Sequence, residues 1–314
     1  MSENLKRAES LFNRIMNQTN DSASVLNKTP PQKLNIEKTI ENTLIQVKKT
    51  DHVLPYCWTI WYHSRNKKPK EEEDSNNIVD SYLQTTTELN FIDFNGNNLK
   101  NFASLEQLLL ILSNIKKTFD LSIGTEFLIF KTGINPVWED PINAKGGRWI
   151  FRFNRNSVED PIQSRKRVCI IWERLVLKTL TGSLIPDIYS SDIQSLLNTD
   201  ICGLVLSIRK DEDILSIWNA NIPSSKKTAN IKSRRILVDS ILRIIREADA
   251  ILSGDESIVY TDNGSTQRVK NVSFEYRIHS DNENTSSHHH NRKCVNKYRN
   301  NNNHIKTESI KESK

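Results

Sequence analysis

The chain has 314 residues, of which 36% are hydrophobic, and its mean hydropathy is -0.56. This apolar content is low for a chain that is folded throughout, so we expect part of it to be disordered. The formal charge of +6, from 44 basic and 38 acidic residues, fits a polyanionic partner but is too small to establish nucleic-acid binding. The sequence has no stretch typical of a signal peptide and no run of about 18 apolar residues, which argues against secretion and membrane spanning.

The cysteines argue for a reducing compartment. They are scattered, and none has the CxxC spacing that is typical of zinc or redox sites. We therefore expect free thiols, a cytoplasmic protein, no bound metal and no cofactor. The run His288-His289-His290 is better explained by the Asn-, His- and Lys-rich composition around it than by a metal site.

The chain divides into three predicted regions. Residues 1–50 are polar and are expected to form a disordered N-terminal extension. Residues 51–278 are expected to form a single folded domain. Residues 279–314 are expected to form a disordered tail.

The first half of the domain alternates strand and helix signals. Aromatic and β-branched residues predict a strand over 52–62, and a charged, structureless loop follows over 66–80. Residues 102–117 predict an amphipathic helix with Ser104 and Gln107 as a capping box. A further strand is expected over 125–131.

The second half adds two helices and a hairpin. Helices are predicted over 162–180 and 226–252, and a strand hairpin with a tight polar turn over 201–219. Residues 257–260 read as a last strand. Three helices and about seven or eight hairpin-connected strands predict an α+β domain.

The stretch 133–153 carries the most chemistry. Pro136 and Pro141 bracket Trp138 and Glu139 and exclude helix, which leaves a stiff loop. An indole beside a carboxylate suits a flat heterocycle with adjacent N–H donors, as on the edge of guanine. A cationic base such as N7-methylguanine adds a cation–π attraction of about 0.5 to 2 kcal/mol to base stacking of roughly 1 to 3 kcal/mol.

A Gly-Gly pair, Gly146 and Gly147, follows as a turn signal and leads into a strand. Alternation along this strand places Trp149, Phe151 and Phe153 on one face, and Arg148, Ile150 and Arg152 on the other. We expect the face that carries the arginines to meet phosphate.

The string GxxPxWEDxxNxxGGRW resembles the signature of the eukaryotic translation initiation factor 4E family, whose members bind the 7-methylguanosine cap of messenger RNA. The resemblance covers about residues 51–262. It implies a curved antiparallel sheet of about eight strands, with three helices on its convex face and the cap slot on its concave face. It also implies capped mRNA as the partner, binding without catalysis, no membrane association and a monomer.

The resemblance also implies roles for individual residues. Trp138 would stack on the base, Glu139 would read its N1 and N2 edge, and Trp218 would lie beside the methyl group. Arg209 and Arg148 would meet the phosphates, with weaker contacts from Arg268 and Lys270.

The second stacking aromatic has two candidates. The class II, or homologous-protein, branch of the family uses a tyrosine in a Ser-Tyr context followed by Gln two residues later, and Tyr82 matches this if residues 90–100 are an insertion. Without the insertion the spacing leads to Ile92, flanked by Phe91 and Phe94. We favour Tyr82, with Phe91 as the alternative.

The predicted partner surface lies on the helix over 102–117. The family binds scaffold and repressor proteins there through YxxxxLΦ helices, and Leu105 and Leu109 would belong to that surface. Leu109 stands where the family usually has tryptophan, which argues against conventional scaffold binding. The Tyr82 context and the short, acidic turn after Arg209 point instead to a class II-type translational repressor.

Two other function classes remain open. An enzyme would use Glu139 and Asp140 as a carboxylate pair, but neighbouring residues on an extended segment point apart, and the predicted domain has no histidine after His63. A protein-interaction module on the same fold, with weak or lost cap binding, is the alternative function.

Overall fold

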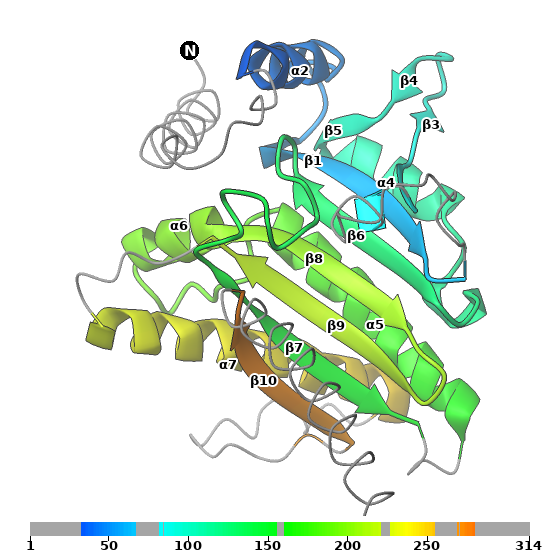
Figure 1. Cartoon of the computed structure of the whole chain (residues 1–314), viewed down its shortest axis with the longest axis vertical. Coiled ribbons are helices and arrows are strands. Elements are labelled where there is room, and N and C mark those ends of the chain that lie inside the picture. Colours follow the sequence, from blue (N-terminus) through cyan, green and yellow to red (C-terminus); the bar gives the residue numbers. More distant parts are fainter. Residues whose placement is uncertain are drawn as a thin grey trace, which may run out of the picture.

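One antiparallel sheet organises the structure, a computed structural model that describes residues 33–66, 82–83, 85–155, 160–220, 227–254, 269 and 271–279. Its strand order is β10-β7-β9-β8-β6-β1-β2, and β5 also pairs with β1 (Figure 1). The strands are β1 (Val53–Ser64), β2 (Thr86–Glu88), β5 (Asn101–Ser104), β6 (Thr125–Lys131), β7 (Gly147–Asn154), β8 (Ile201–Ile208), β9 (Glu212–Asn219) and β10 (Val272–Ile278). The predicted α+β class and the sheet of about eight strands are confirmed.

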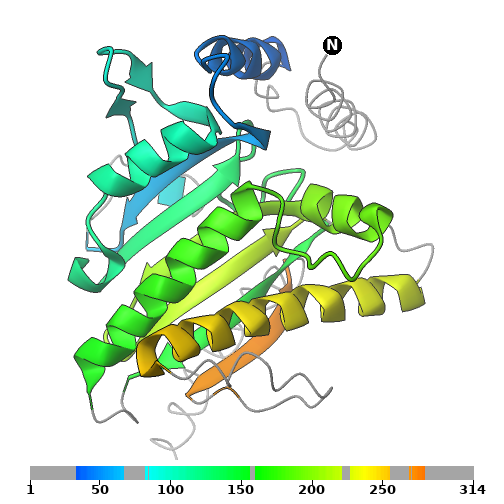
Figure 2. The same ribbon diagram turned by 180° about the vertical axis from the view of Figure 1, so that it is seen from behind.

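The helices gather on one face of this sheet, where α4, α5 and α7 lie in front of the strands in Figure 2. The described residues contain five α-helices, whereas three were predicted. They are α2 (Lys33–Ile45), α4 (Leu105–Asn114), α5 (Pro161–Leu180), α6 (Ser191–Asp200) and α7 (Lys227–Ser253), and a short 3-10 helix η1 spans Thr118–Asp120. The three predicted helices correspond to α4, α5 and α7.

The two helices that were not predicted are weakly marked in the sequence. Helix α2 lies within residues 1–50, where we expected disorder, and α6 is short and polar with no side-chain cap. The ammonium of Lys131 donates to the backbone oxygens of Asn198 and Thr199, 2.9 and 3.0 Å away, at the C-terminal end of α6. A cation at a helix C-terminus is stabilising, and this tertiary contact is invisible to local propensity.

The main core lies between the sheet and the helices. Alternate residues of the central strands point to this side, including Phe127, Leu204, Leu215 and Phe151. They pack against the buried faces of α5 and α7, which contribute Trp172, Leu175, Val176, Ile241 and Ile245. Because this face is sealed by the helices, any ligand of the sheet has to use the other face.

Several elements of the structure differ in their bounds from the sequence predictions. Helix α4 begins at Leu105, three residues later than predicted, because Asn101 and Phe102 pair with β1. Residues 90–100, treated as an insertion, contain a small hairpin of β3 (Phe91–Ile92) and β4 (Asn98–Leu99). Most of the loop predicted over 66–80, and the strand predicted over 257–260, lie outside the described residues.

The capping box of α4 is confirmed and gives a test of the fold. The Ser104 hydroxyl accepts from the Gln107 N–H at 3.2 Å, and the Gln107 side chain accepts from the Ser104 N–H at 3.2 Å. We expect Ser104→Ala to lower the free energy of unfolding by about 1 kcal/mol, because the first turn loses its cap. Ser113→Ala, near the other end of the same helix, should change it far less. Equal losses in urea titrations of the two variants would contradict this assignment.

Candidate functional site

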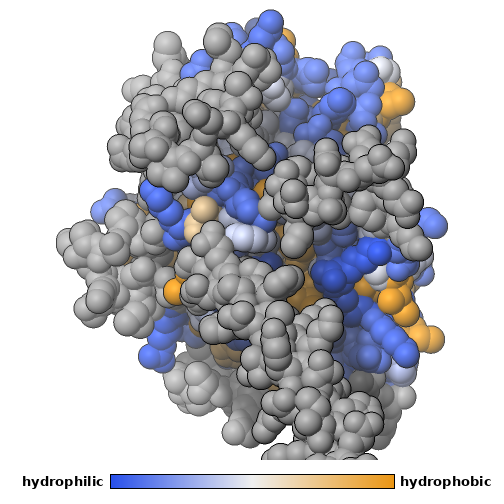
Figure 3. Space-filling model, in the orientation of Figure 1, coloured by the Kyte–Doolittle hydropathy of each residue, from blue (hydrophilic) through white to orange (hydrophobic). Residues whose placement is uncertain are grey.

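The sheet face opposite the helices carries two functional rows of side chains. One row crosses neighbouring strands as His63, Glu126, Ser207, Ile214 and Arg152. The other crosses as Phe130, Gly203, Trp218, Arg148 and Arg277. The expected alternation of Arg148 and Arg152 with the core aromatics of β7 is confirmed. Where described residues reach the surface in this view they are mostly hydrophilic, with hydrophobic residues toward the right-hand edge (Figure 3).

A second, smaller hydrophobic cluster covers part of this face. Sheet residues such as Phe130 and Trp218 pack there against Ile134 and Ile142, which come from the loop between β6 and β7. Trp138 and Tyr82 pack at the edge of the same cluster, each partly buried. The structure therefore brings Tyr82, Trp138 and Trp218, which lie far apart in the sequence, into one cluster with Phe130.

Two buried polar residues shape the loop that carries Trp138 and Glu139. The Asp140 carboxylate accepts from the N–H groups of Asn135 and Ile142, at 2.9 and 3.0 Å. The Asn143 amide donates to the carbonyls of Asn135 and Val137, at 2.9 and 2.8 Å. Since the loop is held by its own side chains, it is formed before any ligand binds.

The two neighbouring carboxylates of this loop differ in role. Asp140 is buried and engaged with backbone donors, so it is a structural residue and not half of a catalytic pair. Glu139 is partly exposed, and among the described residues no cation lies within ion-pair distance of it. Burial raises the pKa of Glu139 above its ordinary value. Of the two carboxylates, Glu139 is thus the more accessible one.

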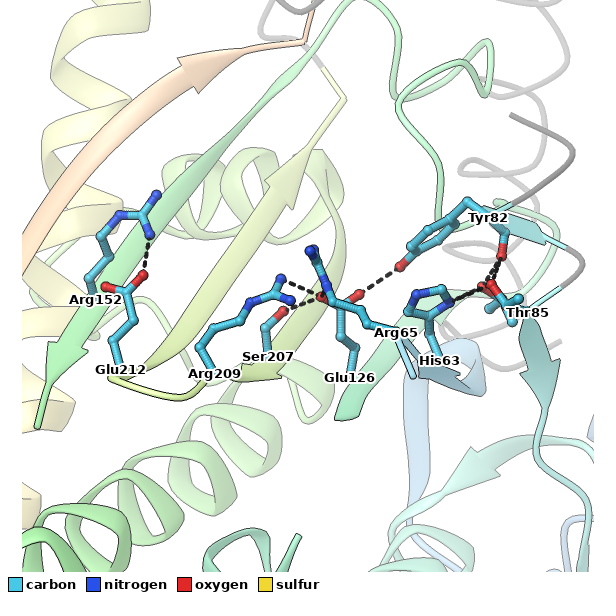
Figure 4. Close-up of polar contacts among 10 residues, drawn as sticks. His63, Arg65, Tyr82, Thr85, Glu126, Arg152, Ser207, Arg209 and Glu212 are labelled. Atoms are coloured by element: carbon cyan, nitrogen blue, oxygen red, sulfur yellow. Dashed lines mark hydrogen bonds and ion pairs between the residues drawn. The ribbon is translucent and has the colours of Figure 1, made fainter. Parts of the chain in front are cut away.

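Glu126 on β6 is the centre of a polar network (Figure 4). Its side chain is only 4% exposed, and its oxygens accept from Arg65 at 3.0 Å, Arg209 at 2.6 Å and the Ser207 hydroxyl at 2.9 Å. The Tyr82 hydroxyl donates to its other oxygen at 3.0 Å. One face of the Tyr82 ring stacks on His63, with centroids 4.1 Å apart. A single carboxylate thus fixes both Tyr82 and Arg209.

The network holds two guanidinium groups, those of Arg65 and Arg209, against the single carboxylate of Glu126. Burial by itself would raise the pKa of Glu126, but Arg65 and Arg209 outweigh burial and hold the pKa below its ordinary value. Burial raises the pKa of Tyr82, so its phenol stays neutral and donates. Because Arg209 is already paired with Glu126, a phosphate would have to share this guanidinium or displace the carboxylate.

Arg148 on β7 differs from Arg209 in its ion pairing. Its guanidinium lies 5.3 Å from the ring centroid of Trp218, and no described residue forms a hydrogen bond with its buried Nε. Burial lowers the pKa of Arg148, and Arg277 on the neighbouring strand lowers it further. By contrast, Arg152 pairs with Glu212 at 2.7 Å. Within the described part of the chain, Arg148 pairs with no carboxylate and keeps hydrogen-bonding capacity for an anion.

The remaining predicted site residues fall elsewhere. Phe91 packs against the main core rather than beside Trp138, and Phe94 is 91% exposed in the turn of the β3–β4 hairpin. Leu105 and Leu109 lie on α4, where Leu109 is 49% exposed. Arg268 and Lys270 lie outside the described residues.

The turn predicted at the Gly-Gly pair is present, since the Gly146 N–H donates to the Asn143 carbonyl at 2.9 Å just before β7 begins. The glycines themselves are required by lack of space and not by their backbone conformation. Neither glycine has a positive φ, and Gly147 is the first residue of β7. A Cβ on Gly146 would collide with the carbonyl oxygen of Asn219, and one on Gly147 would lie 2.5 Å from the Tyr276 hydroxyl. The start of β7 therefore needs glycines because it is tightly enclosed by the ends of β9 and β10.

Sequence reasoning missed two residues of this face. Glu126 had a usable signal, since a carboxylate within the apolar strand TEFLIFK has to be paired when it is buried. His279 had none, because it is the first residue of the segment 279–314, which we expected to be disordered. It is fully buried and lies 4.4 Å from Trp218, ring centroid to centroid.

A known family model matches the part of the chain that forms this sheet face. The family model described as eukaryotic initiation factor 4E matches residues 53–294, which include the loop, the sheet and β10. The chain belongs to this family. The resemblance inferred from the loop motif is thereby confirmed, and the match continues past the predicted limit near residue 262.

Named relatives agree with this membership. Eukaryotic translation initiation factor 4E-4 of Caenorhabditis elegans is 31% identical over 182 residues, covering 58% of this chain and 68% of the relative. Eukaryotic translation initiation factor NCBP of rice (Oryza sativa subsp. japonica) is 29% identical over 216 residues, 68% of this chain and 78% of the relative. A solved complex of C. elegans eIF4E-3 with the 4E-binding protein Mextli has a TM-score of 0.48 and 18% identity, and covers 74% of this chain and 96% of that chain.

Membrane-spanning helices and clustered metal ligands are both absent from the described residues. Those residues contain no helix long and apolar enough to cross a membrane. In the same part of the chain, no group of three or more His, Cys, Asp or Glu side chains is arranged to hold a metal ion.

The Glu126 network predicts a specific loss of stability. Glu126→Gln removes the charge that pairs with Arg65 and Arg209, and we expect it to lower the free energy of unfolding by about 1 to 3 kcal/mol near neutral pH. The folded pKa of Glu126 is depressed, so the wild-type contribution is present above the unfolded pKa and is lost as pH falls through the folded pKa. Urea titrations of the wild type and the variant at several pH values measure the loss of stability and its dependence on pH.

Glu88→Gln, at an exposed position on β2, is the matched control and should leave stability almost unchanged. A gap between the two variants that stays constant as the solution is acidified would contradict the assignment.

Proposed function

We propose that this protein binds the 7-methylguanosine cap of messenger RNA in the cytoplasm and acts, without catalysis, in translation initiation or its regulation. The observation that carries the proposal is that Trp138, next to Glu139 in the chain, shares one hydrophobic cluster with Tyr82 and Trp218. Arg148 lies beside Trp218 and has no ion-pair partner among the described residues. Membership of the initiation factor 4E family supports it, since the named relatives are translation initiation factors.

In this proposal each group has one task. Trp138 and Tyr82 sandwich the methylated base, which gains stacking and cation–π energy. The Glu139 carboxylate accepts from the N1 and N2 donors of guanine, and Trp218 lies beside the methyl group. Arg148 meets the phosphates first, and Arg209 joins to the extent that phosphate displaces Glu126 from it.

The position of Tyr82 supports it over Phe91 as the second stacking residue. Tyr82 shares a cluster with Trp138, whereas Phe91 packs against the main core. A tyrosine here matches the class II branch, and so does the short turn between β8 and β9. We therefore propose regulation of particular messages, including class II-type repression, as the role.

The alternative is a protein-interaction module with weak or lost cap binding. The specific observation in its favour is that Tyr82 and Arg209 are both engaged by Glu126, inside the protein. Binding measurements separate the two functions.

One test of the proposed function concerns recognition of the base. Fluorescence titration should show saturable binding of 7-methyl-GTP, and weaker binding of GTP, which lacks the positive charge on the base. Trp138→Ala, Glu139→Ala and Tyr82→Ala should each abolish most of the affinity. Tyr82→Phe keeps the ring and loses only the hydrogen bond to Glu126, so it should retain most of the affinity.

Failure of the unmutated protein to bind 7-methyl-GTP would overturn the proposal in favour of the interaction module. Full binding by Tyr82→Ala would exclude Tyr82 as the second wall of the slot.

Another test concerns recognition of the phosphates. Arg148→Gln should weaken binding of 7-methyl-GTP and leave 7-methylguanosine, which has no phosphate, almost unaffected. Arg152→Gln is the matched control, because Arg152 is already neutralised by Glu212. The dependence of affinity on salt should become shallower in the Arg148 variant only, since one phosphate contact is lost. An equal loss for both ligands would rule out a phosphate role for Arg148.

A separate test concerns the expected partner surface on α4. We propose that Leu105 and Leu109 belong to a docking surface for a scaffold or repressor with a YxxxxLΦ-type helix, weakened by the missing tryptophan. Leu109 is 49% exposed, so Leu109→Trp adds anchor area without disturbing the core. Titration calorimetry with a YxxxxLΦ peptide should show tighter binding to this variant than to the wild type. Unchanged binding would place the partner elsewhere.

A further inference from the structure

The C-terminal end of β10 reaches the loop that carries Trp138 and Glu139. Strand β10 pairs with β7 up to Ile278 opposite Gly147, and the next backbone N–H, that of His279, donates to the Gly146 carbonyl at 3.1 Å. The His279 side chain lies on the same sheet face as Arg277, two residues before it, and is fully buried. An imidazole is therefore enclosed between the sheet and the loop.

His279 makes two contacts that join separate parts of the site. Its Nδ1 lies 2.8 Å from the Asn143 carbonyl oxygen, and its ring centroid lies 4.4 Å from that of Trp218, with the planes tilted by 49°. Asn143 is the residue whose amide ties the loop together at Asn135 and Val137. One imidazole thus touches both the scaffold of the Trp138 loop and the indole of Trp218.

The chemistry of these contacts fixes the state of the ring. A carbonyl oxygen only accepts, so Nδ1 carries the proton and donates, which leaves Nε2 as an unprotonated acceptor. That Nε2 is buried and has no hydrogen-bond partner among the residues that the structure describes. Burial lowers the pKa of His279 to about 4, and the nearby charge of Arg148 acts in the same direction. His279 is consequently neutral at physiological pH.

A core residue alone would not need this combination. Phenylalanine would supply the ring contact to Trp218 without a donor for Asn143, and a buried acceptor left unsatisfied on Nε2 is a cost that an apolar ring avoids. Histidine is the side chain that provides a flat ring and a directed N–H at once.

We propose that His279 is a positioning residue of the cap site, which holds the indole of Trp218 against the methyl group and anchors the Trp138–Glu139 loop to the last strand of the sheet. This inference rests on the proposed function and extends it to a residue outside the loop motif. The preference for a methylated base thereby depends on the end of β10.

The test compares two variants at this position in the full-length chain. His279→Ala removes both contacts, and we expect affinity for 7-methyl-GTP to fall roughly tenfold or more, the scale of a buried hydrogen bond with its packing. The ratio of 7-methyl-GTP to GTP affinity should fall as well. His279→Phe restores the ring beside Trp218, so it should recover the ratio while the absolute affinity stays low.

A control separates positioning from general destabilisation. Ile241→Val opens a small gap in the core on the helix side of the sheet, and it should lower the melting temperature without changing either affinity or ratio. Circular dichroism of every variant checks that it is folded.

The outcomes distinguish the inference from the proposed function. If the wild type binds 7-methyl-GTP and both His279 variants bind it equally well with the same ratio, the inference is overturned and the proposed function stands. The inference also fails if Ile241→Val shows the same loss as His279→Ala. If the wild type itself does not bind, the proposed function fails and the inference with it.

Discussion

The alternation of side chains across one antiparallel sheet is the constraint on which the structure depends. Each central strand sends every second residue into a core sealed by α5 and α7, so its other residues are left for the opposite face. On that face the register sets Trp218 beside Arg148, and Glu126 beside Ser207. A register slip of one residue would exchange these two sets and destroy core and site together.

The candidate site combines a loop held by internal hydrogen bonds with the guanidinium of Arg209, which is already paired with Glu126. Asp140 and Asn143 fix the loop through backbone hydrogen bonds, so the indole and carboxylate next to them are held in place at little entropic cost on binding. Glu126 is different, because it stabilises the free protein with the same guanidinium that the proposed function assigns to phosphate. Part of the energy of any contact between Arg209 and a ligand is therefore offset by the loss of an internal ion pair.

Local patterns in the sequence were sufficient for the sheet class, for the helices α4, α5 and α7, and for the β8–β9 hairpin, since each has strong periodicity or a capping signal. The loop motif was sufficient for the family. Helix α6 and the burial of His279 were not predictable, because the first is stabilised at its end by Lys131 and the second by contacts with residues 218 and 143. The Gly-Gly pair correctly predicted a turn before β7, but the close approach of the distant Asn219 carbonyl to Gly146 has no local signal in the sequence.

The position of β10 has a consequence for the order of assembly. It is the last described strand in the chain and occupies one edge of the sheet, yet it pairs with β7, which precedes it by more than a hundred residues. During synthesis the loop with Trp138 leaves the ribosome well before residue 279 does. A nascent chain therefore lacks the strand that pairs with this edge of β7, and the imidazole that contacts Trp218, until β10 docks.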